Sequence, residues 1–159
     1  MLQKKSEFLG YSNEEVAAPE HPNNQALAAY WDKQRAGAPA LPRAALEPLD
    51  IPRLLPGIFL AEPCGENTHD YRFRLAGSLV EERMRRKVTG KTLTELFGDN
   101  FGPQTIAIYD RITTTCTPRV LQGHYEGDNL EHIRFEVLHL PLEFANGTRG
   151  ILGGQFAFD

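Results

Sequence analysis

The chain has 159 residues, of which 41% are hydrophobic and 24% charged, and its formal net charge is −4. These values are typical of one soluble globular domain and exclude a chain that is disordered throughout. The longest apolar runs have the length of a strand, so we expect no membrane span, and the negative charge gives no general attraction to nucleic acid.

Residues 1–21 are predicted to form a flexible N-terminal arm. The stretch is polar and is broken by Pro19 and Pro22. Its early lysines are followed by Asn13 and two glutamates rather than by the apolar region of an export signal. We therefore expect a cytoplasmic protein with a single domain over residues 22–159.

A helix with an apolar face is predicted within residues 23–36. Leu27, Tyr30 and Trp31 recur at helical spacing, and Gly37 follows as a stop. Because exposed aromatic faces favour association, these three residues are the predicted interface with a second copy of the chain. The next stretch, residues 38–56, has five prolines, which exclude a long helix.

Two strands are predicted next, at residues 57–62 and 71–76. The first is apolar, and in the second Tyr71, Phe73 and Leu75 alternate with arginines. A polar hairpin loop joins the two.

Three helices follow these strands. Ser78 and Thr92 each precede a glutamate by three residues, which predicts a capping box at the start of two short helices. Pro103 suits the first turn of a longer helix whose apolar face includes Tyr109 and Ile112.

The last part of the chain is predicted to form three strands, at residues 119–125, 133–142 and 150–158. The intervening turns, at 126–129 and 146–147, are rich in residues that tolerate positive φ. The order of elements indicates the α+β class.

The order of these segments, together with three short sequence motifs, resembles that of a compact bacterial family of PAS-like domains. The resemblance is carried by the leucine- and proline-rich stretch 49–56, the strand and glycine at 71–77, and Thr-Gly-Lys at 89–91. It implies a five-stranded antiparallel sheet with helices packed on one face, preceded by the N-terminal amphipathic helix. It also implies a sensory or regulatory role, without choosing a ligand.

Residues that carry cofactors or catalysis are not found in a suitable context. The five histidines lack metal-ligand spacing, and none lies on a predicted core helix, where a haem-binding PAS domain is expected to hold its iron. Cys64 and Cys116 lack the asparagine-cysteine-arginine context of flavin-based light sensors. We expect no haem, flavin or metal and assign no catalytic residue.

Side chains from several predicted elements converge on the inner face of the sheet if the resemblance holds. They form an apolar wall with a few polar tips, which is typical of a small-molecule site. The same residues suit an ordinary filled core, and the sequence leaves both open. The candidates are Tyr71, Phe73, Leu75, Tyr109, Ile112, Phe135 and His139.

Three functions remain open from the sequence. The first is a sensor that binds a small molecule between sheet and helices and signals through a protein partner. The second is a homodimerising interaction module with a filled core, and the third is a small enzyme of unknown reaction. The basic cluster at residues 83–91 has acidic neighbours at helical spacing, so we expect a solvated face there rather than a nucleic-acid site.

Overall fold

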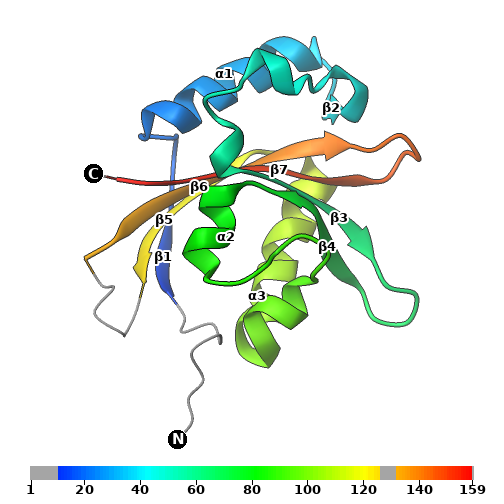
Figure 1. The fold of residues 1–159 in the computed structure, drawn as a ribbon. Helices are drawn as coiled ribbons and strands as arrows, with labels where there is room; N and C mark the ends of the chain where they lie inside the picture. The colour runs from blue at the N-terminus through cyan, green and yellow to red at the C-terminus, as the bar shows by residue number, and fades with distance from the viewer. Residues whose placement is uncertain (1–10, 126–131, 159) are drawn as a thin grey trace, which may run out of the picture.

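A twisted β-sheet separates two layers of helices in the computed structural model, which describes residues 11–125 and 132–158 (Figure 1). Over these residues the neighbouring strands run in the order β1-β5-β6-β7-β3-β4, and each pair is antiparallel. The strands are β1 (Tyr11–Val16), β2 (Leu41–Pro42), β3 (Ile58–Cys64), β4 (Asp70–Ala76), β5 (Arg119–Tyr125), β6 (Arg134–Glu143) and β7 (Arg149–Ala157).

The predicted strand count was too low. The five expected strands correspond to β3 to β7, but β1 adds an edge strand and the short β2 pairs in parallel with the end of β6. The expected turn at 126–129 lies outside the described residues. At the 146–147 turn, the Asn146 side chain accepts a hydrogen bond from the Thr148 backbone N–H at 3.0 Å, and Gly147 has φ 89°. This turn fixes the hairpin between β6 and β7.

The prediction that all of residues 1–21 form an arm was wrong. Residues 11–16 form β1, which pairs with β5 from Tyr11 opposite Tyr125 to Val16 opposite Val120. The Arg119 guanidinium donates to the Glu15 carboxylate at 2.6 Å across this pair. Polar residues suit an edge strand, where they reduce pairing with other chains. Because these residues lack the apolar alternation of a typical strand, the sequence did not predict a strand here.

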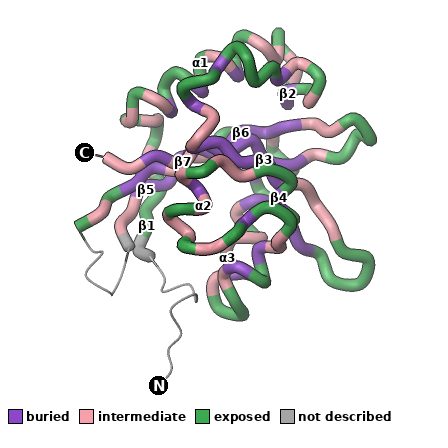
Figure 2. The backbone as a smooth tube through the Cα atoms, viewed as in Figure 1, coloured by how far each residue is buried: buried purple, intermediate pink, exposed green. Residues whose placement is uncertain are grey.

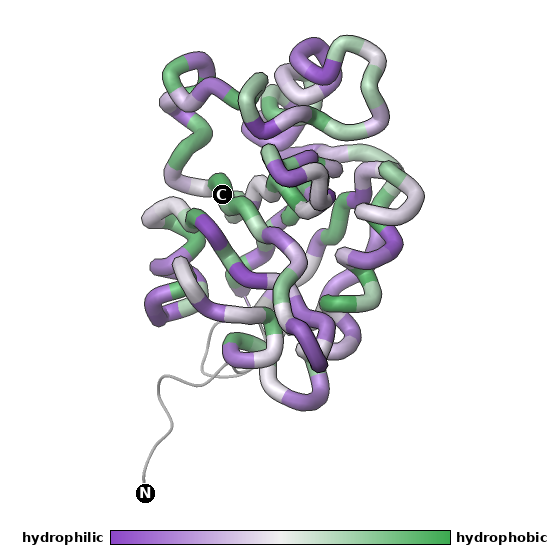
Figure 3. The backbone as a smooth tube through the Cα atoms, turned by 90° about the vertical axis from the view of Figure 1, so that its right-hand side faces the viewer, coloured by the Kyte–Doolittle hydropathy of each residue, from purple (hydrophilic) through white to green (hydrophobic). Residues whose placement is uncertain are grey.

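Helix α1 (Pro22–Arg35) lies on the face of the sheet opposite to α2 and α3, in Figure 1 and in the perpendicular view of Figure 3. The helices predicted to pack on one face are α2 and α3, and the N-terminal helix, whose side the sequence did not predict, covers the other face. Leu27 and Trp31 are buried against the chain's own sheet, and the Trp31 indole donates to the Pro141 carbonyl at 2.9 Å.

The helix face that was predicted to bind a second copy therefore packs against the chain's own sheet. Leu27 and Trp31 are not available to a second copy, and the Tyr30 hydroxyl accepts from the Glu47 backbone N–H at 3.0 Å. Tyr30 thereby ties α1 to the following loop, which contains three short 3-10 turns. These turns are η1 (Arg43–Ala45), η2 (Pro48–Asp50) and η3 (Leu55–Gly57).

A buried carboxylate fixes the start of α1 on the sheet. Glu136 in β6 is fully buried and accepts four hydrogen bonds of 2.7–3.1 Å. The donors are the backbone N–H groups of Glu20 and His21 and the side-chain amides of Asn24 and Gln122. Both oxygens are thereby saturated, which offsets much of the cost of burying the group.

Each face of the sheet has its own hydrophobic core, and the buried residues follow the strands (Figure 2). Along β6, Leu138, Leu140 and Leu142 pack on the α1 side. Val137 packs against the core on the opposite side, where α2 and α3 lie. This alternation follows from the two-residue period of a strand. It explains why the chain carries an almost continuous apolar run at β6.

Two helices cover the second face. They are α2 (Ser78–Met84) and α3 (Leu93–Thr115), and α3 is interrupted at Gly98, whose φ of 76° and ψ of −172° are not helical. The capping box at Thr92 and Glu95 is confirmed, with bonds of 3.1 and 2.8 Å. The capping box at Ser78 was wrong, because Glu81 instead accepts from the Val88 backbone N–H at 2.8 Å beyond the end of α2.

Candidate functional site

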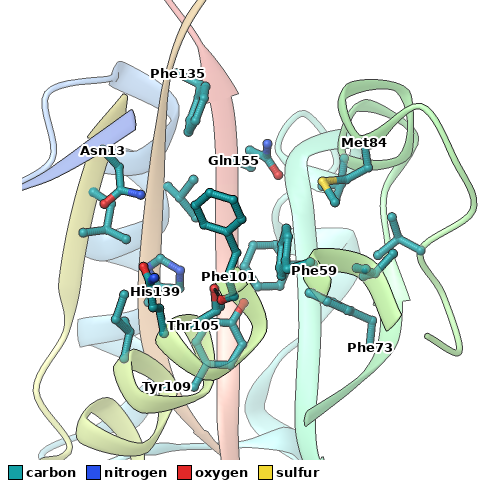
Figure 4. Close-up of a pocket in the computed structure, with 18 residues that line it drawn as sticks. Asn13, Phe59, Phe73, Met84, Phe101, Thr105, Tyr109, Phe135, His139 and Gln155 are labelled. Atoms are coloured by element: carbon teal, nitrogen blue, oxygen red, sulfur yellow. Dashed lines mark hydrogen bonds between the residues drawn. The ribbon is translucent and has the colours of Figure 1, made fainter. Parts of the chain in front are cut away.

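A cavity of about 290 Å³ lies between the second face of the sheet and helices α2 and α3 (Figure 4). Its wall is rich in aromatic side chains: Phe59, Phe73, Phe97, Phe101, Tyr109 and Phe135. A few polar side chains interrupt this wall: Asn13, Gln104, Thr105, His139 and Gln155. Small-molecule sites in proteins have this combination of an apolar lining and few polar groups.

The break at Gly98 shapes the helical wall of the cavity. Leu96 and Phe97 precede the break and Phe101 follows it, and all three line the cavity. Figure 4 shows Phe101 near the centre, with His139 on one side and Phe59 on the other. A continuous helix turns by about 100° per residue, so the non-helical Gly98 changes the direction in which the following side chains project.

A glycine in β7 allows an aromatic ring to lie across the sheet. A Cβ atom at Gly153 would overlap the ring of Phe59, which comes from the neighbouring strand β3. The next residue, Gly154, has the same role on the opposite face, where a Cβ atom would lie 2.7 Å from Leu27 Cδ2 of α1. The two glycines therefore permit close packing on both faces, as the glycine-rich strand suggests.

His139 is the buried polar group of the cavity. The side chain projects from β6, and its ring centroid lies 5.5 Å from that of Tyr109 and 6.1 Å from that of Phe59. Its Nδ1 atom is fully enclosed by protein atoms. Burial lowers the pKa of His139 from 6.5 to about 4, and a hydrogen bond between the ring and the Arg119 backbone offsets part of this shift. The ring is therefore neutral at physiological pH.

Four of the seven predicted pocket residues line the cavity. These are Phe73, Tyr109, Phe135 and His139. Tyr71 and Ile112 are buried in the core beside the cavity without lining it.

The prediction for Leu75 was wrong. Its side chain is 42% exposed and lines a separate, shallow groove beside Arg43 and Phe144. The reason is a bulge: Leu60 pairs with Leu75 but Ala61 pairs with Phe73, which leaves Arg74 as an extra residue in β4. One extra residue reverses the alternation beyond it and turns Leu75 to the other face.

Tyr71 belongs to a polar cluster at the edge of the second core. Its hydroxyl donates to Asp110 Oδ1 at 2.7 Å. His69 Nε2 lies 2.7 Å from the same Asp110 oxygen. The Thr113 hydroxyl lies 3.2 Å from the Tyr71 hydroxyl. Burial, reinforced by Asp110, raises the pKa of Tyr71 far above its usual range, while Thr113 acts in the opposite direction. Tyr71 therefore stays protonated and ties β4 to α3.

Several lining residues were absent from the sequence prediction. Phe59 lies on a predicted strand, but the continuous apolar run there does not tell which face it takes. Phe97 and Phe101 flank the helix break, whose geometry is not visible in the sequence. Asn13 lies in the stretch that was assigned to the arm. The two phenylalanines on either side of Gly98, Phe97 and Phe101, are the sequence feature from which part of this wall could have been predicted.

Other kinds of site find no support among the described residues. In residues 11–125 and 132–158 no three histidine, cysteine or acidic side chains come close enough to hold a metal ion. Cys64 and Cys116 are both free thiols. No helix in the described part of the chain has the length and apolar character needed to cross a membrane.

Comparison with known protein families supports the fold and the resemblance in the sequence. The family profile described as a PAS domain matches residues 19–156, which is most of the chain. Comparison with curated proteins and with solved structures gives no match. The matched region includes α1, both helices of the second layer, strands β2 to β6 and all of β7 except its last residue. The chain therefore belongs to the PAS domain family.

Proposed function

We propose that this PAS domain is a sensor that binds a small, mostly apolar organic molecule in the cavity between the sheet and helices α2 and α3, and that it signals through a protein partner. The family supports a general sensory or regulatory role. The observation that carries the choice of ligand class is the aromatic lining of a cavity of about 290 Å³. At roughly 30 Å³ per water-sized group, this volume suits a molecule of about ten non-hydrogen atoms.

The helix break offers a way in which ligand binding could change the surface of the protein. A ligand that contacts Phe97 and Phe101 touches both sides of Gly98, where the helical hydrogen-bond pattern is already interrupted. Movement at this point costs less than bending a continuous helix, because fewer helical bonds have to break. A partner that contacts the first turns of α3 would then distinguish the occupied from the empty state.

The homodimer alternative loses its main support. The residues predicted to face a second copy, Leu27 and Trp31, are buried inside the chain. The enzyme alternative has no convergent acid, base and nucleophile in the described part of the cavity wall, where His139 is the titratable group beside Tyr109. A binding role therefore accounts best for this wall.

A fragment screen with a pocket-filling variant tests the proposal. Small aromatic fragments are added to 15N-labelled protein, and backbone amide shifts are recorded for the wild type and for Val137→Phe, which places a ring in the cavity wall. The matched control is Leu49→Phe, because Leu49 is 84% exposed and lies outside the cavity.

We expect fragments that shift amides of α3 and β6 in the wild type and in the Leu49 variant, and at least tenfold weaker binding to the Val137 variant. Fragments that bind all three proteins equally, or no fragment binding at all, would refute ligand binding in this cavity.

A further inference from the structure

We infer that the protein partner of this domain docks through an acidic segment on the loop between α2 and α3. This loop, residues 85–91, is called the basic loop because it carries four of the chain's 17 basic residues and none of its 21 acidic residues. The inference rests on the proposed function, since it locates the partner through which the domain would signal.

The end of α2 leaves the cations of the basic loop without neighbouring carboxylates. In the sequence, Glu82 stands at helical spacing from Arg86, which predicts an ion pair. The helix ends before Arg85, whose φ of 59° is left-handed, so Arg86 no longer lies on the helix. Among the described residues, no carboxylate forms an ion pair with Arg86, Lys87 or Lys91. Their charges are therefore available to a partner.

The backbone of the basic loop is already used within the chain. The Glu81 carboxylate accepts hydrogen bonds from the backbone N–H groups of Val88 at 2.8 Å and Thr89 at 3.3 Å. These bonds lower the pKa of Glu81, and Lys87 contributes less to this shift. A loop that holds a phosphate group usually does so with backbone N–H groups of this kind. The side chains remain to bind anions, which favours carboxylates spread along a segment over a single phosphate.

The distribution of charge favours a short acidic segment over nucleic acid. Outside the basic loop the chain has 13 basic and 21 acidic residues, so its remaining net charge is negative. Duplex DNA would extend beyond the loop and be repelled there. A short segment with a few carboxylates can contact Arg86, Lys87 and Lys91 alone, and an arginine binds a carboxylate through two parallel hydrogen bonds.

The basic loop also forms part of the cavity wall. Val88 is 1% exposed and lines the cavity, as does Met84 at the end of α2, which Figure 4 shows beside it. Between these two residues, Lys87 is exposed and Arg86 is partly exposed. The loop then leads directly into α3. A ligand that displaces Met84 or Val88 would therefore move the cations, and by linkage the partner would change the affinity for the ligand equally.

A peptide titration with matched variants tests the docking surface. A short peptide of alternating glutamate and serine is added to the 15N-labelled full chain, and the same peptide with glutamine in place of glutamate tests the need for charge. The loop variant is Arg86→Gln/Lys87→Gln. The control, Lys33→Gln/Arg53→Gln, removes the same charge at two exposed positions outside the loop.

We expect the glutamate peptide to bind the wild type and the control and to shift amides of residues 85–91. The loop variant should bind it roughly fourfold or more weakly, because each surface ion pair contributes a factor of about two to five. The glutamine peptide should not bind, and this comparison needs no variant. No binding of the glutamate peptide, or equal binding to both variants, would overturn the docking surface.

A short DNA duplex tests the kind of partner. Tighter binding of the duplex than of the glutamate peptide to the basic loop, at the same salt concentration, would overturn the choice of an acidic protein segment.

The link to the cavity is tested with naphthol, a small aromatic molecule of about the size of the cavity. Saturation with naphthol should change the affinity of the wild type for the peptide roughly twofold or more, and should have no effect in Val137→Phe. An unchanged affinity with naphthol bound would overturn this link.

Failure of this inference can be told apart from failure of the proposed function. If fragments bind in the cavity and the peptide does not bind, only the docking surface is overturned. If the peptide binds the basic loop and no fragment binds, the ligand proposal fails while the docking surface stands.

Discussion

His139 and Glu136 are buried polar side chains of the same strand, and the core accommodates them in different ways. Glu136 is saturated by four donors from the chain. His139 instead lies among aromatic rings, and its burial lowers the pKa to about 4, so the ring is neutral at physiological pH. Saturation by hydrogen bonds and loss of charge are two ways in which a core accommodates a polar group.

The low pKa of His139 makes the stability of the fold depend on pH. The unfolded chain binds a proton at this histidine below pH 6.5, whereas the folded chain resists protonation until about pH 4. This contribution to the free energy of unfolding is therefore fully present above pH 6.5, falls as the pH drops toward 4, and is constant below that.

Replacing His139 should remove this contribution. Between pH 7 and pH 5 we expect the wild type to lose about 2 kcal/mol more stability than His139→Phe. Urea denaturation of both proteins at the two pH values measures the difference, and carboxylates elsewhere cancel because both proteins share them. Parallel pH profiles would show that His139 titrates normally in the folded chain.

Removal of the Glu136 charge should loosen the start of α1. In Glu136→Gln one carboxylate oxygen becomes an amide N–H₂ group, which cannot accept hydrogen bonds. The two donors that bonded to this oxygen are then buried without an acceptor. We expect a loss of about 2–4 kcal/mol in the free energy of unfolding, measured by urea denaturation.

A matched control lies in the same strand. Glu143 forms an ion pair with Arg149 at 3.4 Å, and its side chain is 42% exposed. Glu143→Gln should therefore change stability by less than about 0.5 kcal/mol. Equal effects of the two substitutions would mean that the Glu136 network contributes no more than a surface ion pair.

At the scale of the elements, α1 and the sheet form one packed unit. Trp31 is buried and bonded to the Pro141 carbonyl, so Trp31→Ala should lower the free energy of unfolding by about 3–5 kcal/mol. The molar mass by light scattering should equal that of the wild type, because this face packs inside the chain. Lys33→Ala, at an exposed position of the same helix, is the control.

A change in molar mass on Trp31→Ala at unchanged stability would instead support the interface between two copies that the sequence suggested. The two readouts together therefore separate packing within the chain from packing between chains.

Much of the fold was predictable because periodicity identifies elements well. The five strands β3 to β7 and helix α1 follow from apolar spacing and from proline and glycine positions. The side of the sheet that α1 covers did not follow, because an apolar stripe shows that a helix packs but not against which face. Strand β1 was missed because its residues are polar.

The site was predictable only in part for a related reason. Alternation along β4 correctly placed Phe73 in the cavity, but the bulge at Arg74 reversed it for Leu75. The sequence could not choose between a filled core and an open cavity. That choice depends on how the side chains around Gly98 pack, which the sequence pattern does not specify.

At the scale of the whole molecule, the two faces of the sheet have different roles. The face under α1 is a hydrophobic core held by the Glu136 network. The face under α2 and α3 contains the cavity with His139 in its wall. The Glu136 network and the cavity therefore lie on opposite sides of one sheet, so that a proposed ligand could change the cavity side while the α1 side stays intact.

The central claim is that a small molecule enters the cavity between the sheet and α3. Intermolecular nuclear Overhauser effects between the labelled protein and a small aromatic fragment of suitable size, naphthol, test its location directly. We predict contacts from naphthol protons to the rings of Phe59, Phe101 and Phe135, and their loss in Val137→Phe. Contacts only to residues outside the cavity, such as those around Leu75, or no contacts at saturating naphthol, would contradict the account.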